Sequence, residues 1–512
     1  MLFGEPRPEL LPRKLLTMTD DIPLTRIATR SGSTTTSPDA SGPTSDPGKV
    51  TIVLDGKRGV RLQPQTRLLN NLLLGVGLLE IANAGDFAAN VWNEAPPPLF
   101  AQVLMGLGGS LALFMINFAV LDAIRSWKNI KVLRIECQYL RRQRMSTQDR
   151  HTSRTIDTLL EVNAREMGCE LINRFGMDCL LGFGALVVGI GTFLAIGGSD
   201  REIYLSSNQL TGYIGNSPCA LYGFLCLCWC FCLWRRASQH NRAVQTRLGT
   251  ENTRIQRMMR NRTSSVQFHA ALNGIAAAVA GAASVATATM WWGYVVLLPC
   301  LVTSVLVNYF WRNRVGYSRL LVQDLVTMDE ESILDALRYV DWCLRRVKDA
   351  PADPLSVLVS DHTSLASVME FLTDNQLFES FCDRVVKDAE LFSALCPADQ
   401  TTWTITWRDL ATTTQPELTA RLLAIATDLV RDASPTCFKH QQRFLLEALG
   451  TYKCRSKVKD RRRSAPTSPQ NWQQLQQQQQ RRNAHTYSGR HGDDWLFGGF
   501  QVTELVKQAF RT

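Results

Sequence analysis

The sequence lacks the common signatures of an enzyme. Its 512 residues contain no GxxxxGK phosphate loop, HExxH zinc helix, GxSxG nucleophile elbow or protein-kinase signature set. The seven histidines are scattered with no pair at metal-ligand spacing, and the fourteen cysteines include no CxxC pair. These absences give no reason to expect catalysis, a cofactor or a metal centre, so a protein without enzymatic activity is the simpler interpretation.

Aromatic residues are missing from one of the most basic segments. The formal net charge is +10, and the segment from Arg235 to Arg262 carries eight Lys or Arg residues but no Phe, Trp or Tyr. Single-stranded nucleic acids bind to aromatic stacking platforms, which this segment does not offer. Basic residues beside an apolar segment attract anionic lipid instead. The charge pattern therefore favours a lipid bilayer over nucleic acid as the partner.

Charge is nearly missing from six stretches, although the mean hydropathy of the whole chain is only −0.08. Each stretch holds close to the ~20 residues that a helix rising 1.5 Å per residue needs to cross a ~30 Å hydrocarbon layer. If the last two stretches formed one helix, its length would be about twice the thickness of this layer, so a break near residues 290–292 is expected. The stretches are about 68–92, 99–121, 178–197, 212–234, 268–289 and 293–311. The sequence predicts an all-α, polytopic membrane protein with about six transmembrane helices.

Basic residues are also nearly missing from the three connections on one side of this arrangement. Those connections hold only Arg201 of the chain's 56 Lys and Arg residues, whereas the segments 125–150 and 235–262 hold eight each. Because positive charge near spans stays in the cytosol, both termini are expected there. The N-terminus lacks the layout of a cleaved signal, so an internal span would direct insertion. The pattern does not separate the plasma membrane from an endomembrane. The three connections are 93–98, 198–211 and 290–292.

Composition divides the chain into five parts. The tails are poor in residues that could form a core, and the C-terminal one is rich in Gln and basic residues. Helical signals elsewhere include a capping box at Thr327 and Glu330, a start at Pro416 and a stop at Gly450. The parts are a disordered tail (1–48), a short hairpin or juxtamembrane segment (49–67), a six-span domain (68–311) with long basic cytosolic loops (122–177 and 235–267), a cytosolic helical domain (312–454) and a mostly disordered tail (455–512).

The first low-charge stretch contains a stripe of polar residues. At 100° per residue, Glu80, Asn83, Asp86 and Asn90 fall within roughly 120° of a helical wheel. A carboxylate costs at least ~2.5 kcal/mol near the centre of a bilayer, so Glu80 should face protein or water. The stripe is therefore either part of an ion, proton or solute path, or a packing seam. In a seam, Glu80 is protonated or hydrogen-bonded to one of four polar residues: Asn117, Asn273, His269 or Asn308.

Four cysteines occur at alternate positions in the fourth stretch. In a helix Cys226 and Cys230 share one face while Cys228 and Cys232 share the opposite one, so the four cannot converge on a tetrahedral zinc ion. Inside a span, thiols behave as small apolar groups. The alternative is S-palmitoylation of Cys230 or Cys232, which lie close to the basic residues that follow the span.

A second candidate modification lies in the C-terminal tail. The basic run 457–463 is followed by Ser464 and by Ser468, which precedes a proline. Phosphorylation of these serines would oppose the positive charge beside them. They are therefore candidate sites of a regulated electrostatic patch.

Two classes of function compete for these observations, and a membrane enzyme without recognised motifs is a third, less favoured class. In the first, the protein is transporter- or channel-like and uses the stripe that begins at Glu80. In the second, it is a membrane anchor or scaffold whose cytosolic helices, within 327–454, bind a protein partner. The sequence names no substrate and no oligomeric state.

Overall fold

The computed structural model describes seven parts of the chain: residues 47–55, 59–63, 65–92, 96–321, 329–396, 402–413 and 415–463. These parts are mostly helical, with a few short strands. The expected disordered tails lie almost entirely outside them, as do the candidate phosphorylation sites Ser464 and Ser468. The described residues up to Arg455 belong to one compact unit.

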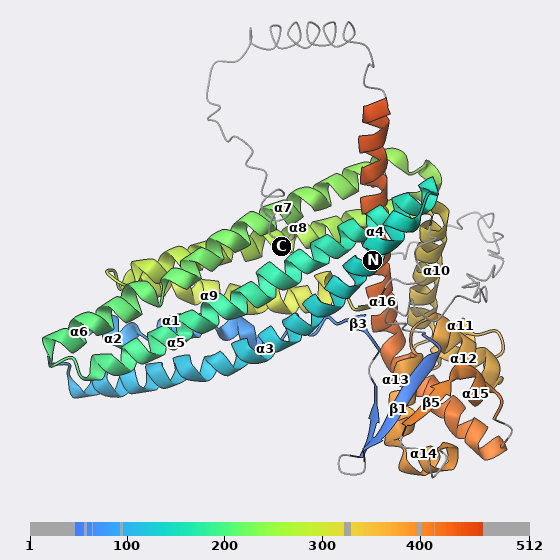
Figure 1. Ribbon diagram of the computed structural model, residues 1–512, viewed down its shortest axis with the longest axis horizontal. Helices are drawn as coiled ribbons and strands as arrows, with labels where there is room; N and C mark the ends of the chain where they lie inside the picture. The colour runs from blue at the N-terminus through green and yellow to red at the C-terminus, as the bar shows by residue number, and fades with distance from the viewer. Residues whose placement is uncertain are drawn as a thin grey trace, which may run out of the picture. The chain divides into compact units, whose positions relative to one another are not determined.

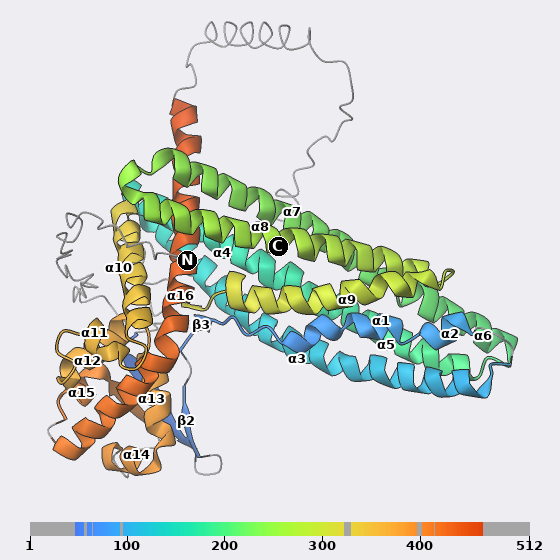
Figure 2. The ribbon, with the colours of Figure 1, turned by 180° about the vertical axis from the view of Figure 1, so that it is seen from behind.

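Five helices are long and apolar enough to cross a membrane. Figure 1 shows them side by side, and Figure 2 shows the same bundle from behind. Helix α4 continues into α5 through the π-helical turn η2 (Cys169–Gly176), and α6 (Arg201–Asn208) joins α7 through the π-helical turn η3 (Gln209–Ile214). The principal helices are α3 (Leu99–Ser146), α4 (Arg150–Gly168), α5 (Met177–Ile196), α7 (Ser217–Arg247), α8 (Thr253–Ala286) and α9 (Trp292–Phe310).

The basic segments expected to be long loops are helical for most of their length. Helix α3 has 48 residues and is therefore about 72 Å long at 1.5 Å per residue, far more than a ~30 Å apolar layer. Its basic half forms a helical hairpin with α4, and the basic ends of α7 and α8 form a second hairpin. The expectation of loops at 122–177 and 235–267 is thus wrong, because alternating charged and apolar positions continue the helices beyond their uncharged parts.

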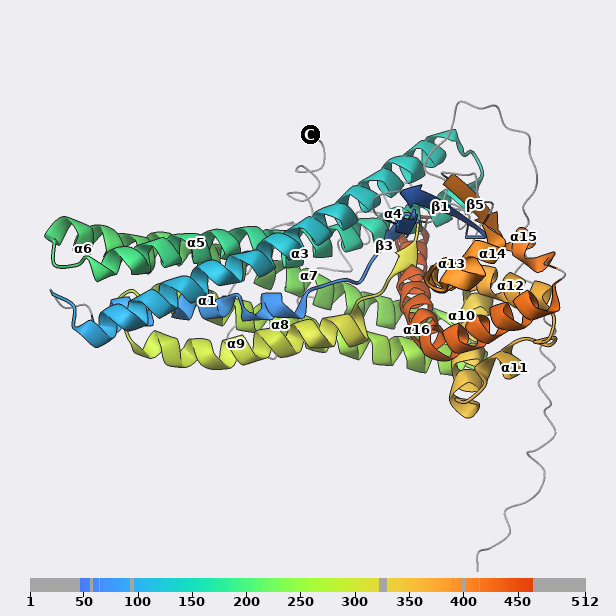
Figure 3. The same cartoon turned by 90° about the horizontal axis from the view of Figure 1, so that it is seen from below.

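The stretch 68–92 is not the continuous helix that its low charge predicts. After β3 (Arg67–Leu68) the chain is extended, and then forms the short helices η1 (Leu74–Leu78), α1 (Glu80–Ala84) and α2 (Phe87–Val91). Figure 3 shows this segment running along α3 and α9. Because these helical pieces are so short, a single helical wheel does not describe the whole segment. The predicted polar stripe assumed such a wheel.

Contacts with neighbouring helices explain the breaks. The backbone N–H groups of Leu69 and Leu73 donate to Asn129 Oδ1 (3.3 Å) and Asp122 Oδ1 (2.9 Å) on α3, in place of helical carbonyls. Gly77 lies so close to α9 that a Cβ atom there would be 2.9 Å from the Cα atom of Val305. Polar side chains of α3 and close backbone packing thus replace regular helical hydrogen bonding.

The expected break between the last two apolar stretches is confirmed. Helix α8 ends at Ala286 and α9 begins at Trp292, with a turn between them. The indole of Trp291 at this turn is 66% exposed. Two helices, rather than one of twice the length, therefore pack side by side.

The C-terminal part consists of helices and one small sheet. Strands β1 (Lys49–Asp55) and β2 (Gly59–Leu62) pair in antiparallel register with Ile52 opposite Leu62. Strand β5 (Thr402–Thr406), which the sequence did not predict, pairs with the other edge of β1. The helices are α10 (Glu330–Asp349), α11 (Pro354–Leu358), α12 (Leu365–Asp374), α13 (Phe378–Lys387), α14 (Ala389–Leu395), α15 (Trp407–Ala411) and α16 (Pro416–Arg463).

Two expected helix ends differ. Asp329 caps α10 by accepting a hydrogen bond from Ser332 N at 2.9 Å, whereas the expected cap, Thr327, lies outside the described residues. Helix α16 continues through Gly450 instead of stopping there. A Cβ atom at Gly450 would lie 2.7 Å from Cγ of His240, so this glycine permits close approach of α16 to α7. The glycine serves helix packing rather than helix termination.

One hydrophobic core crosses the domain boundary expected at residue 312. Leu159 of α4, Val244 of α7 and Met259 of α8 belong to the same buried cluster as Leu337 of α10 and Phe438 of α16. The basic halves of the two helical hairpins therefore pack directly against the C-terminal helices. The ion pairs described below lie at this junction.

Candidate functional site: two adjoining polar cavities

The structure separates the members of the predicted polar stripe. Glu80 opens α1 and lines a cavity inside the bundle, whereas Asp86 and Asn90 belong to a different hydrogen-bonded cluster. The side chain of Asn83 lies outside the described side chains. Of the predicted path, only Glu80 thus lines the cavity. The breaks in this segment place Asp86 and Asn90 in another cluster.

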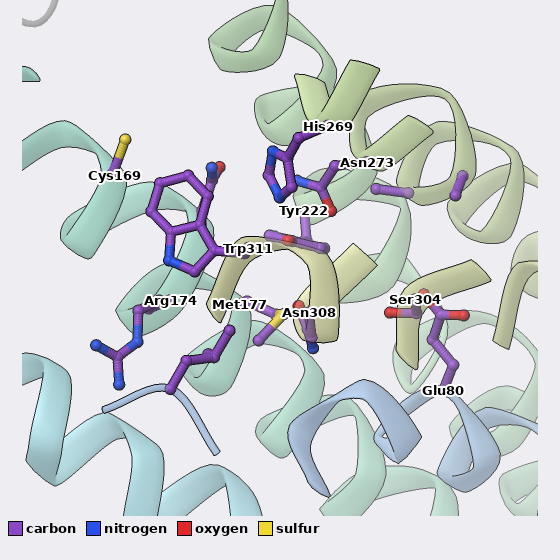
Figure 4. A pocket seen from close by; sticks show the side chains of 14 residues that line it. Glu80, Cys169, Arg174, Met177, Tyr222, His269, Asn273, Ser304, Asn308 and Trp311 are labelled. Carbon is purple, nitrogen blue, oxygen red and sulfur yellow. The ribbon is translucent and has the colours of Figure 1, made fainter. Parts of the chain in front are cut away.

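Helices from across the bundle and the broken first segment build the cavity around Glu80 (Figure 4). Its volume is about 30 Å³, counted as space open to the centre of a water molecule. About 10–15 Å³ by this measure holds one water, so the cavity admits a few waters or a small ion. It is far too small for a metabolite. The lining residues are Leu72, Glu80, Cys169, Asn173, Arg174, Met177, Tyr222, His269, Asn273, Ala276, Ala277, Ser304, Asn308 and Trp311.

Several polar atoms in this cavity have no partner among the described residues. Glu80 is 5% exposed, and its carboxyl group lies beside Ser304, but Oε2 accepts no hydrogen bond there. Asn308 Nδ2 and both side-chain polar atoms of Asn173 are likewise buried without a partner. An unsatisfied buried polar group costs about 1–3 kcal/mol, so water or an ion is expected to occupy this space.

Three of the four residues predicted as partners of Glu80 do reach its cavity. His269, Asn273 and Asn308 line it together with Glu80. Asn117 does not, because its amide donates to the carbonyl oxygen of Phe114 on its own helix at 2.9 Å. The seam and the path interpretations therefore concern the same cavity.

Asp86 and Asn90 form a closed cluster with Tyr294. The Tyr294 hydroxyl donates to Asp86 Oδ1 at 2.8 Å, and Asn90 Nδ2 lies 3.0 Å from Asp86 Oδ2. Thr211 donates to Asn90 Oδ1 at 3.3 Å. Asp86 is fully buried, so its carboxyl group forms hydrogen bonds with protein groups and not with water at the outer end of the bundle. The cluster joins α2 to α9 and η3, which favours the packing interpretation for these two residues.

The cysteine run divides as helical geometry predicts. Cys226 and Cys230 are buried, with Asn273 Nδ2 at 3.2 Å and 3.5 Å from their sulfur atoms, whereas Cys228 and Cys232 are partly exposed. An acyl chain on Cys230 would require this buried face to open. Cys232 therefore remains the better placed of the two predicted palmitoylation sites.

Arg174 anchors the π-helical turn at one side of the first cavity. Its guanidinium donates to Asp122 at 2.9 Å and to Glu170 at 2.9 Å, and all three side chains are largely buried. Asp122 also accepts the hydrogen bond from Leu73 N that interrupts the first segment. One ion-paired group thus fixes both η2 and the chain that leads to Glu80.

A second cavity adjoins the first through His269 and Trp311, which line both. Its volume is also about 30 Å³ by the same measure. Three arginines from three helices reach it: Arg165 of α4, Arg236 of α7 and Arg262 of α8. Among the described residues, the only carboxylate that lines it is Glu447 of α16. The two cavities form a polar series from this basic end toward Glu80.

Glu447 balances part of that positive charge. Its Oε1 atom lies 3.5 Å from Arg165 Nε and 3.3 Å from Arg236 Nε. Burial alone would raise the pKa of Glu447, but the charges of Arg165, Arg236 and Arg262 hold this pKa well below its usual range. Glu447 is therefore ionised at neutral pH.

A buried ion network borders the second cavity, and sequence analysis missed it. Arg319 lies in the short strand β4 (Arg319–Leu320), which pairs with β3. It bonds to Glu136 of α3 at 2.6 Å and to Glu166 of α4 at 2.5 Å. Tyr317 donates to Glu166 at 2.6 Å and accepts from Arg165 at 2.9 Å. Burial would lower the pKa of Arg319, but the two carboxylates raise it well above its ordinary value. A basic residue just after an apolar helix was the only sequence signal.

No group of three or more His, Cys, Asp or Glu side chains in the described part of the chain could hold a metal ion. The chemistry available at the two cavities is therefore ion pairing, hydrogen bonding and proton exchange at a carboxyl group. Comparison with protein-family models, curated proteins and solved structures finds no match to this chain.

Proposed function

We propose that this chain is an integral membrane protein whose bundle crosses the bilayer six times, with both termini in the cytosol, and that it passes protons or small ions through the cavity at Glu80. Five long apolar helices and the broken segment before them would supply the six crossings. The transport part of the proposal rests on the buried polar atoms around Glu80 that have no hydrogen-bond partner among the described residues.

Exposed apolar side chains support the membrane placement. Nearly all large hydrophobic side chains that are exposed fall within 99–124, 183–234 and 268–309, and the described residues from 316 to 455 contribute none. Phe224 is 64% exposed, Leu107 63% and Leu298 64%. Soluble monomers rarely expose apolar patches above a few hundred Å², so contact with lipid tails is the natural explanation.

The distribution of charge supports the orientation. The basic halves of both helical hairpins extend from the same end of the apolar helices and share a core with the C-terminal helices. Basic residues that flank spans remain in the cytosol. The second, arginine-lined cavity would then open toward the cytosol, and Glu80 would lie deeper in the membrane.

A broken span supports a path at Glu80. Irregular backbone at membrane depth is tolerated only where it is enclosed by protein or lines a cavity, and here it does the latter. An intramembrane carboxyl group with an unpaired oxygen is suited to accept and release a proton or to hold a cation. The volume of about 30 Å³ fits solutes of this size.

Flux through reconstituted vesicles tests this proposal. Purified full-length protein is placed in vesicles, and flux of H⁺, K⁺ and Cl⁻ is measured under an imposed potential. We expect flux of at least one ion above that of protein-free vesicles. Glu80→Gln should reduce this flux to background, whereas Glu202→Gln, at an exposed carboxyl group of α6, should leave it unchanged. Equal flux in wild type and Glu80→Gln would remove Glu80 from the path.

The competing function is a membrane anchor or scaffold whose helices within 327–454 bind a protein. The small volume of both cavities favours this alternative, because neither is an open channel. Absence of flux of all three ions, together with a protein that co-purifies with the full-length chain, would support it.

A further inference from the structure

We propose that the second cavity is a binding site for a phosphate group, held by Arg262 and Arg165 at the junction of α4, α7, α8 and α16. The site does not depend on the transport function proposed above. Two sources can supply the phosphate group: the headgroup of a membrane lipid, or inorganic phosphate. The lipid source alone rests on the proposed membrane placement.

Arg262 is the principal observation. It is 7% exposed, and its Nη1 atom donates to the backbone carbonyls of Val315 (2.7 Å) and Arg314 (3.2 Å), which fix the guanidinium. Its Nε and Nη2 atoms, which form the other edge of the guanidinium, are buried without a hydrogen-bond partner in the described chain. That edge has the geometry that binds two oxygens of one oxyanion.

Arg165 supplies a second open donor. Its side chain is 8% exposed, and its Nη2 atom donates to Tyr317, which fixes its position. Its Nε atom is buried without a hydrogen-bond partner among the described residues and lies 3.5 Å from Glu447, longer than a normal hydrogen bond. Two fixed guanidinium groups with open N–H atoms therefore line the same small cavity.

The balance of charge favours an anion over water alone. The lining carries Arg165, Arg236 and Arg262 against Glu447. Outside the lining, Arg236 also pairs with Glu161 at 3.7 Å, but Arg262 forms no ion pair with any described carboxylate. A buried charge with no carboxylate in direct contact is costly, and a bound anion would supply that contact.

The size and position of the cavity identify the anion more closely. A space of about 30 Å³ admits one compact oxyanion but not a nucleotide. Arg236 follows Trp234, which is 45% exposed, and Arg262 precedes Phe268, which is 54% exposed, so the cavity lies where the exposed apolar surface ends. In the proposed membrane placement this is the level of the lipid phosphates.

Thermal unfolding of the full-length protein in a phosphorus-free maltoside detergent tests the site. Sodium phosphate is titrated against sodium chloride at matched ionic strength, and native mass spectrometry records bound phospholipid after purification and after added phosphatidic acid. We expect phosphate, phosphatidic acid or both to raise the midpoint of unfolding beyond the chloride control. Stabilisation by phosphate identifies free phosphate, and retention of phosphatidic acid identifies the lipid.

Two variants and a control locate the binding. Arg262→Gln should weaken phosphate binding about tenfold or more, the effect of losing a charge-assisted bidentate contact. The control Arg260→Gln, at an exposed residue of the same helix, should bind as wild type does. Glu447→Gln should bind more tightly than wild type, because it removes the competing carboxylate. If wild type gains no stability from phosphate and retains no phosphate-bearing lipid, or if Arg262→Gln binds as tightly as wild type, the proposal is wrong.

Discussion

Arg319 on β4 donates hydrogen bonds of 2.6 Å and 2.7 Å from its two terminal nitrogens to both carboxylate oxygens of Glu136 on α3. The partners are 183 positions apart in the chain and almost fully buried. The pair joins the helical bundle to the strand that leads into the C-terminal helices. Its burial makes the pair sensitive to the loss of either partner.

Glu136→Gln is expected to destabilise the protein by about 3–5 kcal/mol, because Arg319 would keep its buried charge with one carboxylate fewer. Unfolding of the purified protein in detergent, followed by intrinsic tryptophan fluorescence, measures this change. The matched control is Asp335→Asn, which breaks the exposed pair with Arg338 and should cost about 0–1 kcal/mol. Equal effects of the two substitutions would show that the buried pair does not join the two parts.

Gly450→Ala is expected to destabilise the packing of α16 on α7 by about 1–3 kcal/mol, since the added Cβ would lie 2.7 Å from ring atoms of His240. His240→Ala should relieve this clash, so the double variant should be more stable than the sum of the single effects predicts. Gly249→Ala is the control, because no atom lies within 4 Å of its added Cβ. Strict additivity of Gly450→Ala and His240→Ala would contradict the close approach.

Tyr294→Phe is expected to cost about 1–3 kcal/mol, because it removes the hydrogen bond that the Tyr294 hydroxyl donates to the fully buried Asp86. Tyr309→Phe, at a residue of the same helix that is 58% exposed, is the control. Both are compared by thermal unfolding in the same detergent. A Tyr294→Phe variant as stable as the control would mean that Asp86 is satisfied by other groups.

Stability should fall as pH is lowered from about 6.5 toward about 4, because of His440. Burial, with a contribution from Arg443, lowers the pKa of His440 from 6.5 to about 4, and its Nδ1 atom accepts a hydrogen bond from Ser318 N at 3.3 Å. Below pH 6.5 the unfolded chain binds a proton that the folded chain does not, so unfolding becomes more favourable. The lowered pKa of Glu447 adds a further loss of stability below its ordinary value of 4.5.

This dependence is checked by measuring the midpoint of urea unfolding at pH values from about 7.5 to about 3.5. His440→Gln should reduce the loss of stability between about pH 6.5 and about pH 4, whereas His362→Gln, at an exposed histidine, should retain the wild-type profile. A His440→Gln variant with an unaltered profile would assign that pH dependence to other groups.

The long apolar helices could be predicted from sequence, because low charge over about 20 residues is a local property. The break at Leu69 and Leu73 could not, since it depends on Asn129 and Asp122 of another helix. The division of the cysteines followed from the helical repeat alone, as Cys226 shows. Local pattern thus predicts elements, whereas contacts between elements decide where they are interrupted.

The site was predictable only in part for the same reason. Glu80 was a sound candidate because a carboxyl group in an apolar segment must find a partner or water. Asp86 was assigned to the same stripe on the assumption of one helix, and the interruption places it against Tyr294 instead. Arg262 was expected in a long basic loop and Arg319 at the start of the cytosolic helical domain, and only the packing of α16 and β4 reveals their burial. Sequence does not show which charges a distant segment will cover.

Placement of the bundle in a membrane is the central claim, and a glycosylation map tests it most directly. Acceptor sites are inserted singly in the turn at 198–200, in the turn at 248–250 and after residue 512, in full-length protein made with microsomal membranes. The proposed six-span placement predicts modification at 198–200 alone. Modification at 248–250 or after residue 512, or release of the unmodified protein from the membranes by alkaline carbonate, would contradict it.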